Sequence, residues 1–178
     1  MNIAAFAGSN SSTSINRRLV KHVLTYFNED STNLLDLNDF EMSLYSIDRE
    51  KKNGIPKKAH RFREHMHNAE IIICSLAEHN RSYTVAFKNI LDWCSRVDLN
   101  IFGNNPTFLM STSPGGYGGG NVMEAATKML PGCGADIVTT YSLPSFYDNF
   151  SNEDEDILDE ELAKNLEDDI QLFKNNVE

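Results

Sequence analysis

Residues 70–76 read Glu70-Ile71-Ile72-Ile73-Cys74-Ser75-Leu76, the clearest strand signal in the sequence. A short apolar run without polar alternation is typical of a strand that is buried on both faces of a parallel sheet. Apolar residues at helical spacing precede this run over residues 57–69 and follow it from Phe87 to Val97. The segment therefore predicts a buried strand with one helix before it and one after it.

The same alternation continues along the whole chain. Four more apolar runs have the length of strands, at residues 3–7, 33–37, 106–111 and 135–141, and three more segments have helical spacing, at residues 15–27, 121–130 and 158–173. Residues 38–56 have neither pattern. Five strands that alternate with five helices predict an α/β fold, a doubly wound, flavodoxin-like sandwich with a five-stranded parallel sheet in the order 2-1-3-4-5 and helices on both faces. We expect residues 1–178 to form one such domain.

The formal net charge of −10 is concentrated near the carboxyl end. Residues 148–169 carry 11 acidic side chains and one basic one, Lys164, and the rest of the chain has 15 of each sign. We interpret the acidic segment as a loop plus the solvated face of a last helix. Residues 49–63 hold seven basic side chains, which suit a solvated helix face, a nucleotide phosphate or the acidic segment of another subunit. Because an acidic protein repels phosphate backbones, we expect no nucleic-acid partner.

The sequence shows no signal for a membrane, secreted or metal-binding protein. No apolar run approaches the roughly 20 residues that span a bilayer. No basic segment precedes the apolar residues at the N-terminus, so we expect a cytoplasmic protein. The three cysteines, Cys74, Cys94 and Cys133, form no CxxC pair and no zinc spacing, which predicts neither disulfides nor a metal site.

Polar loops follow the first, third and fourth predicted strands. In an open parallel sheet, ligands bind beyond the carboxyl ends of the strands, where the strand order reverses. The first loop, Gly8-Ser9-Asn10-Ser11-Ser12-Thr13-Ser14-Ile15-Asn16, offers hydroxyl groups and a helix N-terminus, which favours a single phosphate group. It lacks both the Walker A and the GxGxxG patterns. The alternative interpretation is a Ser/Thr-rich turn with an ordinary helix cap.

The other two loops have the character of a ligand site edge. The third-strand loop reads Ala77-Glu78-His79-Asn80-Arg81-Ser82-Tyr83, and taken alone it favours a polar turn over a site edge. The fourth-strand loop, Ser113-Pro114-Gly115-Gly116-Tyr117-Gly118-Gly119-Gly120, contains half of the ten glycines of the chain. Glycines let the backbone approach a flat ligand closely, so this loop favours an aromatic ring over a simple surface turn.

Together these loops resemble the NAD(P)H-dependent FMN reductase family over roughly residues 2–145. The family's Gly-Ser-x-Arg-x-x-Ser-x-Asn loop corresponds to residues 8–16, its Pro-Glu-Tyr-Asn-x-Ser stretch to residues 77–82, and its Leu-Lys-Asn-x-x-Asp-Trp motif to residues 87–93. Its glycine-rich loop corresponds to residues 113–120. The resemblance implies an enzyme that moves electrons from NADPH or NADH through FMN to a small acceptor such as free flavin or a quinone. It also implies a homodimer or homotetramer.

The resemblance further implies which residues meet FMN, and it requires no catalytic side chain because the flavin carries the reaction. The expected cofactor-binding residues are Ser9, Ser11, Ser14, Ile15 and Asn16 at the phosphate, Ala77, Glu78, His79 and Asn80 at the ring edge, and Ser113, Gly115, Gly116 and Tyr117 at the pyrimidine side. Three departures stand out. Ser11 replaces the phosphate-loop arginine, for which Arg17 or Arg18 is a candidate substitute. Ala77 and His79 replace a proline and a tyrosine, and Tyr83-Thr84-Val85 replaces an Ile-Pro-Gly turn.

Two alternatives to the reductase remain. A flavodoxin-like electron carrier would bind FMN without oxidising NAD(P)H, and its acidic surface would suit basic partners. A non-catalytic domain would have kept the fold and lost the flavin, as the replacements at Ser11 and Ala77 allow.

Overall fold

The computed structural model describes residues 1–27 and 30–177, and its centre is a five-stranded parallel sheet. The strands run in the order β2-β1-β3-β6-β7, with bounds β1 (Asn2–Ala7), β2 (Ser31–Leu35), β3 (Ile71–Leu76), β6 (Asn105–Thr112) and β7 (Ala135–Leu143). This is the predicted order and confirms the flavodoxin-like α/β fold class. A separate two-stranded hairpin, β4 (Glu78–His79) and β5 (Ser82–Tyr83), follows β3.

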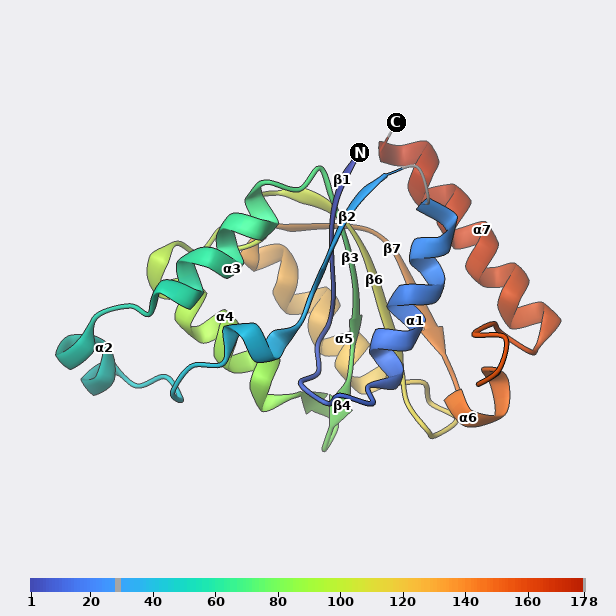
Figure 1. The fold of residues 1–178 in the computed structure, drawn as a ribbon, viewed down its shortest axis with the longest axis horizontal. Coiled ribbons are helices and arrows are strands. Elements are labelled where there is room, and N and C mark those ends of the chain that lie inside the picture. The colour runs from blue at the N-terminus through green and yellow to red at the C-terminus, as the bar shows by residue number, and fades with distance from the viewer. Residues whose placement is uncertain (28–29, 178) are drawn as a thin grey trace.

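Helices cover both faces of the sheet (Figure 1). One face is covered by α1 (Ile15–Leu24) and α7 (Glu160–Val177), and the other by α3 (Lys57–His67), α4 (Val85–Val97) and α5 (Gly120–Met129). Four shorter turns, η1 (Thr25–Phe27), η2 (Leu37–Phe40), η3 (Leu130–Cys133) and α6 (Phe146–Asn149), lie in the connections. The remaining helix, α2 (Ile47–Asn53), projects away from the sheet and has no buried residue (Figure 1).

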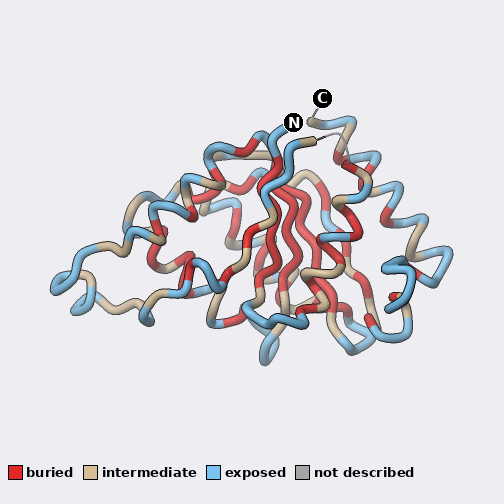
Figure 2. Tube along the Cα trace, viewed as in Figure 1, coloured by how far each residue is buried: buried red, intermediate tan, exposed pale blue. Residues whose placement is uncertain are grey.

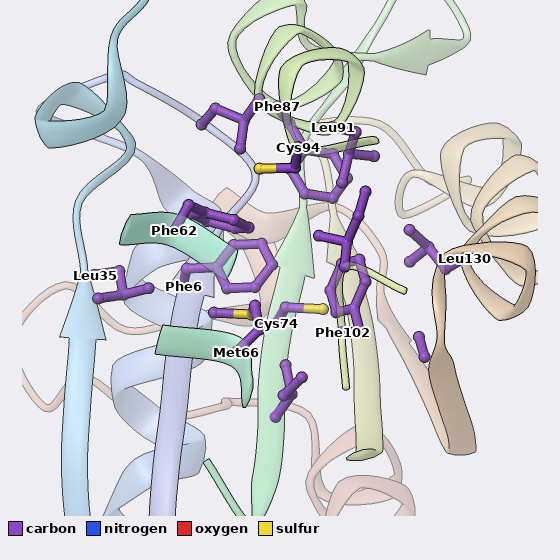
Figure 3. Close-up of a cluster of buried hydrophobic side chains, with 14 of the residues drawn as sticks. Phe6, Leu35, Phe62, Met66, Cys74, Phe87, Leu91, Cys94, Phe102 and Leu130 are labelled. Atoms are coloured by element: carbon purple, nitrogen blue, oxygen red, sulfur yellow. The ribbon is translucent and has the colours of Figure 1, made fainter. Parts of the chain in front are cut away.

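Alternate residues of each central strand pack into two separate cores, since successive side chains point to opposite faces. In β1, Phe6 joins the α3–α4–α5 side and Ile3 the α1–α7 side. The ring of Phe6 lies 5.7 Å from the rings of both Phe62 and Phe87, at the middle of the cluster drawn in Figure 3. The central strands are buried along almost their whole length (Figure 2), which explains the continuous apolar run in β3.

Several predicted boundaries are wrong for local reasons. The second strand ends at Leu35 because the side chain of Asp36 accepts the N–H of Asn38 and starts η2. The segment predicted as irregular holds η2 and α2, and Ser46 caps α2 by accepting the N–H of Arg49. The last helix begins at Glu160, so Leu158, expected on its apolar stripe, lies outside it and is 58% exposed.

None of the helices in the described residues is both long and apolar enough to cross a bilayer. The acidic C-terminal helix α7 instead packs on the sheet, and the ring of Phe173 stacks on that of Phe108 at 5.6 Å. Phe173 is fully buried, whereas its neighbour Leu172 is 50% exposed.

Replacing Phe173 by Ala is therefore expected to lower the free energy of unfolding by about 3–5 kcal/mol, because it opens a cavity between α7 and the sheet. Leu172→Ala, on the solvent side of the same helix, is the control and should change it by less than about 1 kcal/mol. Urea unfolding followed by circular dichroism measures both. Equal, small losses would show that α7 is dispensable to the core.

Candidate functional site

The three polar loops meet in one pocket of about 230 Å³ at the carboxyl ends of β1, β3 and β6. Its walls come from each loop in turn: Ser9, Ser11, Thr13, Ser14, Ile15 and Asn16; Ala77, Glu78 and His79; and Thr112, Ser113, Pro114 and Tyr147. From β1 the chain goes to β2 on one side, and from β2 it crosses to β3 on the other side of β1. The pocket therefore lies where the strand order reverses.

Nine of the thirteen predicted cofactor-binding residues line this pocket. They are Ser9, Ser11, Ser14, Ile15, Asn16, Ala77, Glu78, His79 and Ser113. The other four, Asn80, Gly115, Gly116 and Tyr117, are exposed and lie outside its lining. Which of the thirteen touch FMN stays a prediction.

The side chain of Asn16 holds the pocket floor together. Its Nδ2 donates to the carbonyl of Thr112 at 3.1 Å, while its Oδ1 accepts the backbone N–H of Thr112 at 3.1 Å and the hydroxyl of Ser75 at 2.6 Å. Asn16 is 2% exposed. With these three bonds inside the protein, its side chain fixes the loop rather than presenting itself to a phosphate.

The first turn of α1 supplies the donors for an anion. Ser14 caps the helix by accepting the N–H of Arg17 at 3.2 Å, and the backbone N–H groups of Ile15 and Asn16, at the first two helical positions, have no partner within the helix. The hydroxyls of Ser11 and Thr13 lie 3.3 Å apart beside them. Free N–H groups, short hydroxyls and the positive end of the helix dipole together fit a phosphate group.

Neither candidate arginine is directed into the pocket. Arg17 pairs with Asp36 at 3.0 Å. Arg18 donates to the carbonyl of Ser151 and lies over the rings of Phe146 and Phe150, at 5.4 and 4.9 Å. The donors that line the phosphate end of the pocket are therefore neutral, and the family's charge-assisted contact is not replaced.

The hairpin β4–β5 forms the next wall, and its sharp turn places Asn80 (φ 52°) and Arg81 (φ 64°) in the left-handed region. Sequence reasoning expected a polar loop at the edge of the site here and did not predict the two short paired strands. Ala77, Glu78 and His79 line the pocket, and the carboxylate of Glu78 is bonded to the start of α5.

In the glycine-rich loop the positive φ angles are at Gly118 (+60°) and Gly119 (+80°), not at Gly115 or Gly116. A Cβ on Gly118 would come within 3.2 Å of the backbone of Leu143, so this turn packs on the end of β7. Tyr117 is 67% exposed and its ring rests on Gly120. The loop brings Ser113 and Pro114 to the pocket and leaves the next three residues at the surface.

Sequence reasoning missed Tyr147, which reaches the pocket from α6 and is 64% exposed. It also missed Thr13, Pro114 and Thr112, the last residue of β6. The signal for Tyr147 was available, since its loop follows the last strand at the same edge of the sheet as the other loops.

A second hollow of about 320 Å³ adjoins the first, and His79 lines both. Its wall is formed largely by the residues after β2 and by the start of α4, among them Leu37, Phe40, Leu44, Val85 and Ile90. Its mixed apolar and amide lining suits a flat organic molecule or an apolar side chain better than an anion.

Other reactive groups give no competing site in the part of the chain described. Burial raises the pKa of the Cys74 and Cys94 thiols to about 12, so neither is a nucleophile near neutral pH. The imidazoles of His65 and His67 bond to Asn33 and to the carbonyl of Asn100 respectively. Residues 1–27 and 30–177 contain no cluster of side chains arranged to hold a metal ion.

Comparison with known proteins agrees with this geometry. A family model described as NADPH-dependent FMN reductase matches residues 1–148. An NADPH:quinone oxidoreductase from Arabidopsis thaliana is 30% identical over 122 residues, which are 66% of this chain and 60% of that protein. A quinone reductase from Pseudomonas putida is 30% identical over 129 residues, 72% of this chain and 68% of that protein.

Solved structures share the fold at lower identity. FerB, a flavoenzyme NAD(P)H:(acceptor) oxidoreductase from Paracoccus denitrificans, superposes with a TM-score of 0.77 at 23% identity and covers 99% of this chain and 96% of its own. A flavodoxin from Pseudomonas aeruginosa gives 0.57 at 13% identity, covering 98% of this chain and 99% of its own. The family model extends over most of the chain, and the protein therefore belongs to the NADPH-dependent FMN reductase family, whose cofactor is FMN and whose electron donor is NAD(P)H.

Proposed function

We propose that this protein oxidises NADPH or NADH through FMN and passes the electrons to a small acceptor, a quinone or free flavin. The observation that carries the proposal is the pocket formed by three loops at the strand-order reversal, with the N-terminus of α1 at one side. The quinone reductases among the relatives support the class of acceptor. A cytoplasmic location remains a prediction.

The donor arrangement favours a single phosphate, as in FMN, over the pyrophosphate of a dinucleotide. Helices α1, α4 and α5 follow the three loops, and the first residues of α4, Val85 and Ala86, line the second hollow instead of this pocket. The N-terminus of α5 is already occupied by the carboxylate of Glu78, whereas the first N–H groups of α1 are free of intrahelical partners. One open helix end provides for one phosphate group.

The protein's own part in the reaction is to position and shield. Ser9, Ser11, Thr13 and Ser14 hold the phosphate with the first turn of α1, and Ala77 and Ser113, which line the same pocket, meet the ring. FMN, when bound, supplies the hydride-accepting and electron-transferring chemistry. No side chain has to move a proton, which agrees with a pocket whose only titratable groups are Glu78, His79 and Tyr147.

Two measurements test the proposal, first flavin binding and then flavin reduction. The purified protein is incubated with FMN, desalted, and mixed anaerobically with NADPH or NADH while the visible flavin band is followed. We expect the band to bleach, and we expect FMN to bind at least about tenfold more tightly than riboflavin because only FMN has the phosphate. Neutral donors make binding weaker than an arginine would, so the affinity is measured by titration as well as by retention.

Other outcomes identify the alternatives. A band that bleaches with dithionite and not with either nicotinamide cofactor would point to an electron carrier. No change in protein fluorescence when FMN is titrated would show a domain that has lost the flavin. Either result contradicts the reductase.

We further propose that two copies associate through the surface formed by Leu44, Ile47 and Val85. These side chains are 58%, 48% and 66% exposed. Leu44 and Val85 line the second hollow, and Ile47 begins α2 three residues after Leu44. The seven-residue helix α2 has no buried residue, and so short a helix is marginal without packing. A second copy seated here would cover α2 and close the hollow beside His79.

Val85→Glu is expected to convert the assembly to monomers, because it places a charge in the apolar contact. Leu99→Glu, at an equally exposed site outside this surface, is the control and should leave the assembly intact. Size-exclusion chromatography with light scattering measures the mass. A monomeric wild type, or dissociation by both variants alike, would contradict this surface.

A further inference from the structure

The hairpin β4–β5 lies outside the main sheet and is held by only two residue pairs, Glu78 with Tyr83 and His79 with Ser82. A hairpin of this size is not stable by itself in water. It nevertheless forms one wall of the pocket through Ala77 and His79. Its position must therefore depend on contacts with a more rigid element.

Helix α5 has no side-chain cap from the residue that precedes it. The residue before it is Gly119, whose φ is 80° and which has no side chain to accept a hydrogen bond. Helix N-termini leave several backbone N–H groups without partners, and a neighbouring oxygen usually satisfies one of them. Here the oxygen comes from a distant part of the chain.

Glu78 supplies that oxygen from the hairpin. Its Oε2 accepts the backbone N–H of Val122 at 3.0 Å, and its Oε1 accepts Nδ2 of Asn121 at 3.0 Å. Val122 is the third helical residue, which is the position that a capping side chain normally serves. The negative charge also lies at the positive end of the helix dipole.

The start of α5, to which Glu78 is bonded, is held firmly by the core and by the glycine-rich loop. Val122 is fully buried in the core, and the hydroxyl of Ser111 donates to the carbonyl of Gly118 at 2.8 Å. The glycine-rich loop that leads into α5 is bonded further to the segment after β7, through Ser145 and Phe146. A bond from Glu78 to α5 thus joins the β3 loop to the β6 loop, the two that flank the ring end of the pocket.

We propose that Glu78 is a positioning residue, which clamps the hairpin to the start of α5 and so sets the width of the slot for the flavin ring. The carboxylate acts through Asn121 and Val122 and does not itself touch the flavin. This inference rests on the proposed flavin site. It adds a side-chain role to the sequence-based expectation that Glu78 lies at the ring edge.

Three variants test the clamp. Glu78→Gln keeps the size of the side chain and replaces one acceptor oxygen by an NH₂ group that cannot accept the N–H of Val122 or of Asn121. Asn121→Ala removes one of the two bonds and leaves the charge in place. Glu124→Gln is the matched control, since Glu124 lies on the same helix, is exposed and pairs only with Lys128 in the next turn.

Affinity for two flavins separates the clamp from the phosphate site. We expect Glu78→Gln to weaken the binding of FMN and riboflavin by the same factor, about tenfold, because the ring end is common to both. Asn121→Ala should weaken both by a smaller factor, and the double variant should lose less than the product of the two single losses. Glu124→Gln should match the wild type. A loss confined to FMN, or equal affinities in Glu78→Gln and Glu124→Gln, would overturn the proposal.

Hydrogen exchange without flavin gives an independent measurement. The amide of Val122 should exchange at least about tenfold faster in Glu78→Gln than in the wild type or in Glu124→Gln. Unchanged exchange would show that no clamp exists. If the wild type binds neither flavin, the proposed function fails, and the exchange of this amide still decides whether the clamp holds. If Glu78→Gln does not fold, the Asn121→Ala comparison carries both tests.

Discussion

The carboxamide of Asn16 joins the first turn of α1 to the ends of β3 and β6, and the remainder of the site depends on that junction. It bonds to both backbone groups of Thr112 at the end of β6 and to the hydroxyl of Ser75 in β3, and it stands in the first turn of the helix that follows β1. Leaving such groups buried and unpaired would cost roughly 1–3 kcal/mol each. The junction therefore keeps the free N–H groups of α1 facing the loops from β3 and β6.

In the part of the chain described, the phosphate end of the site has no charged donor, because the nearby arginines and the Glu78 carboxylate are bonded elsewhere. Arg17 and Arg18 hold Asp36 and the segment after β7, and Glu78 occupies the start of α5. One helix end with neutral donors remains for an anion. We expect such a site to bind one phosphate group with lower affinity than a site that contains an arginine. This affinity is compatible both with an exchanging flavin and with a flavin that stays bound.

The sequence was sufficient to predict the fold because the spacing of apolar residues follows which side chains are buried. The unbroken apolar run in β3 is buried on both faces, as a central parallel strand must be. The sequence also located the three loops, since chain topology alone brings strand ends together. Local bonds were not visible in the pattern. Asp36 ended a strand early, Leu158 fell outside the last helix, and Tyr147 reached the pocket from a loop without a motif.

The central claim is that the phosphate of FMN binds at the first turn of α1, and a crystal structure of the FMN complex tests it most directly. The account predicts phosphate oxygens within hydrogen-bonding distance of the backbone N–H groups of Ile15 and Asn16, with the ring between the loops that contain Ala77 and Ser113. A phosphate held instead by arginine or lysine side chains, or a flavin bound away from these loops, would contradict it.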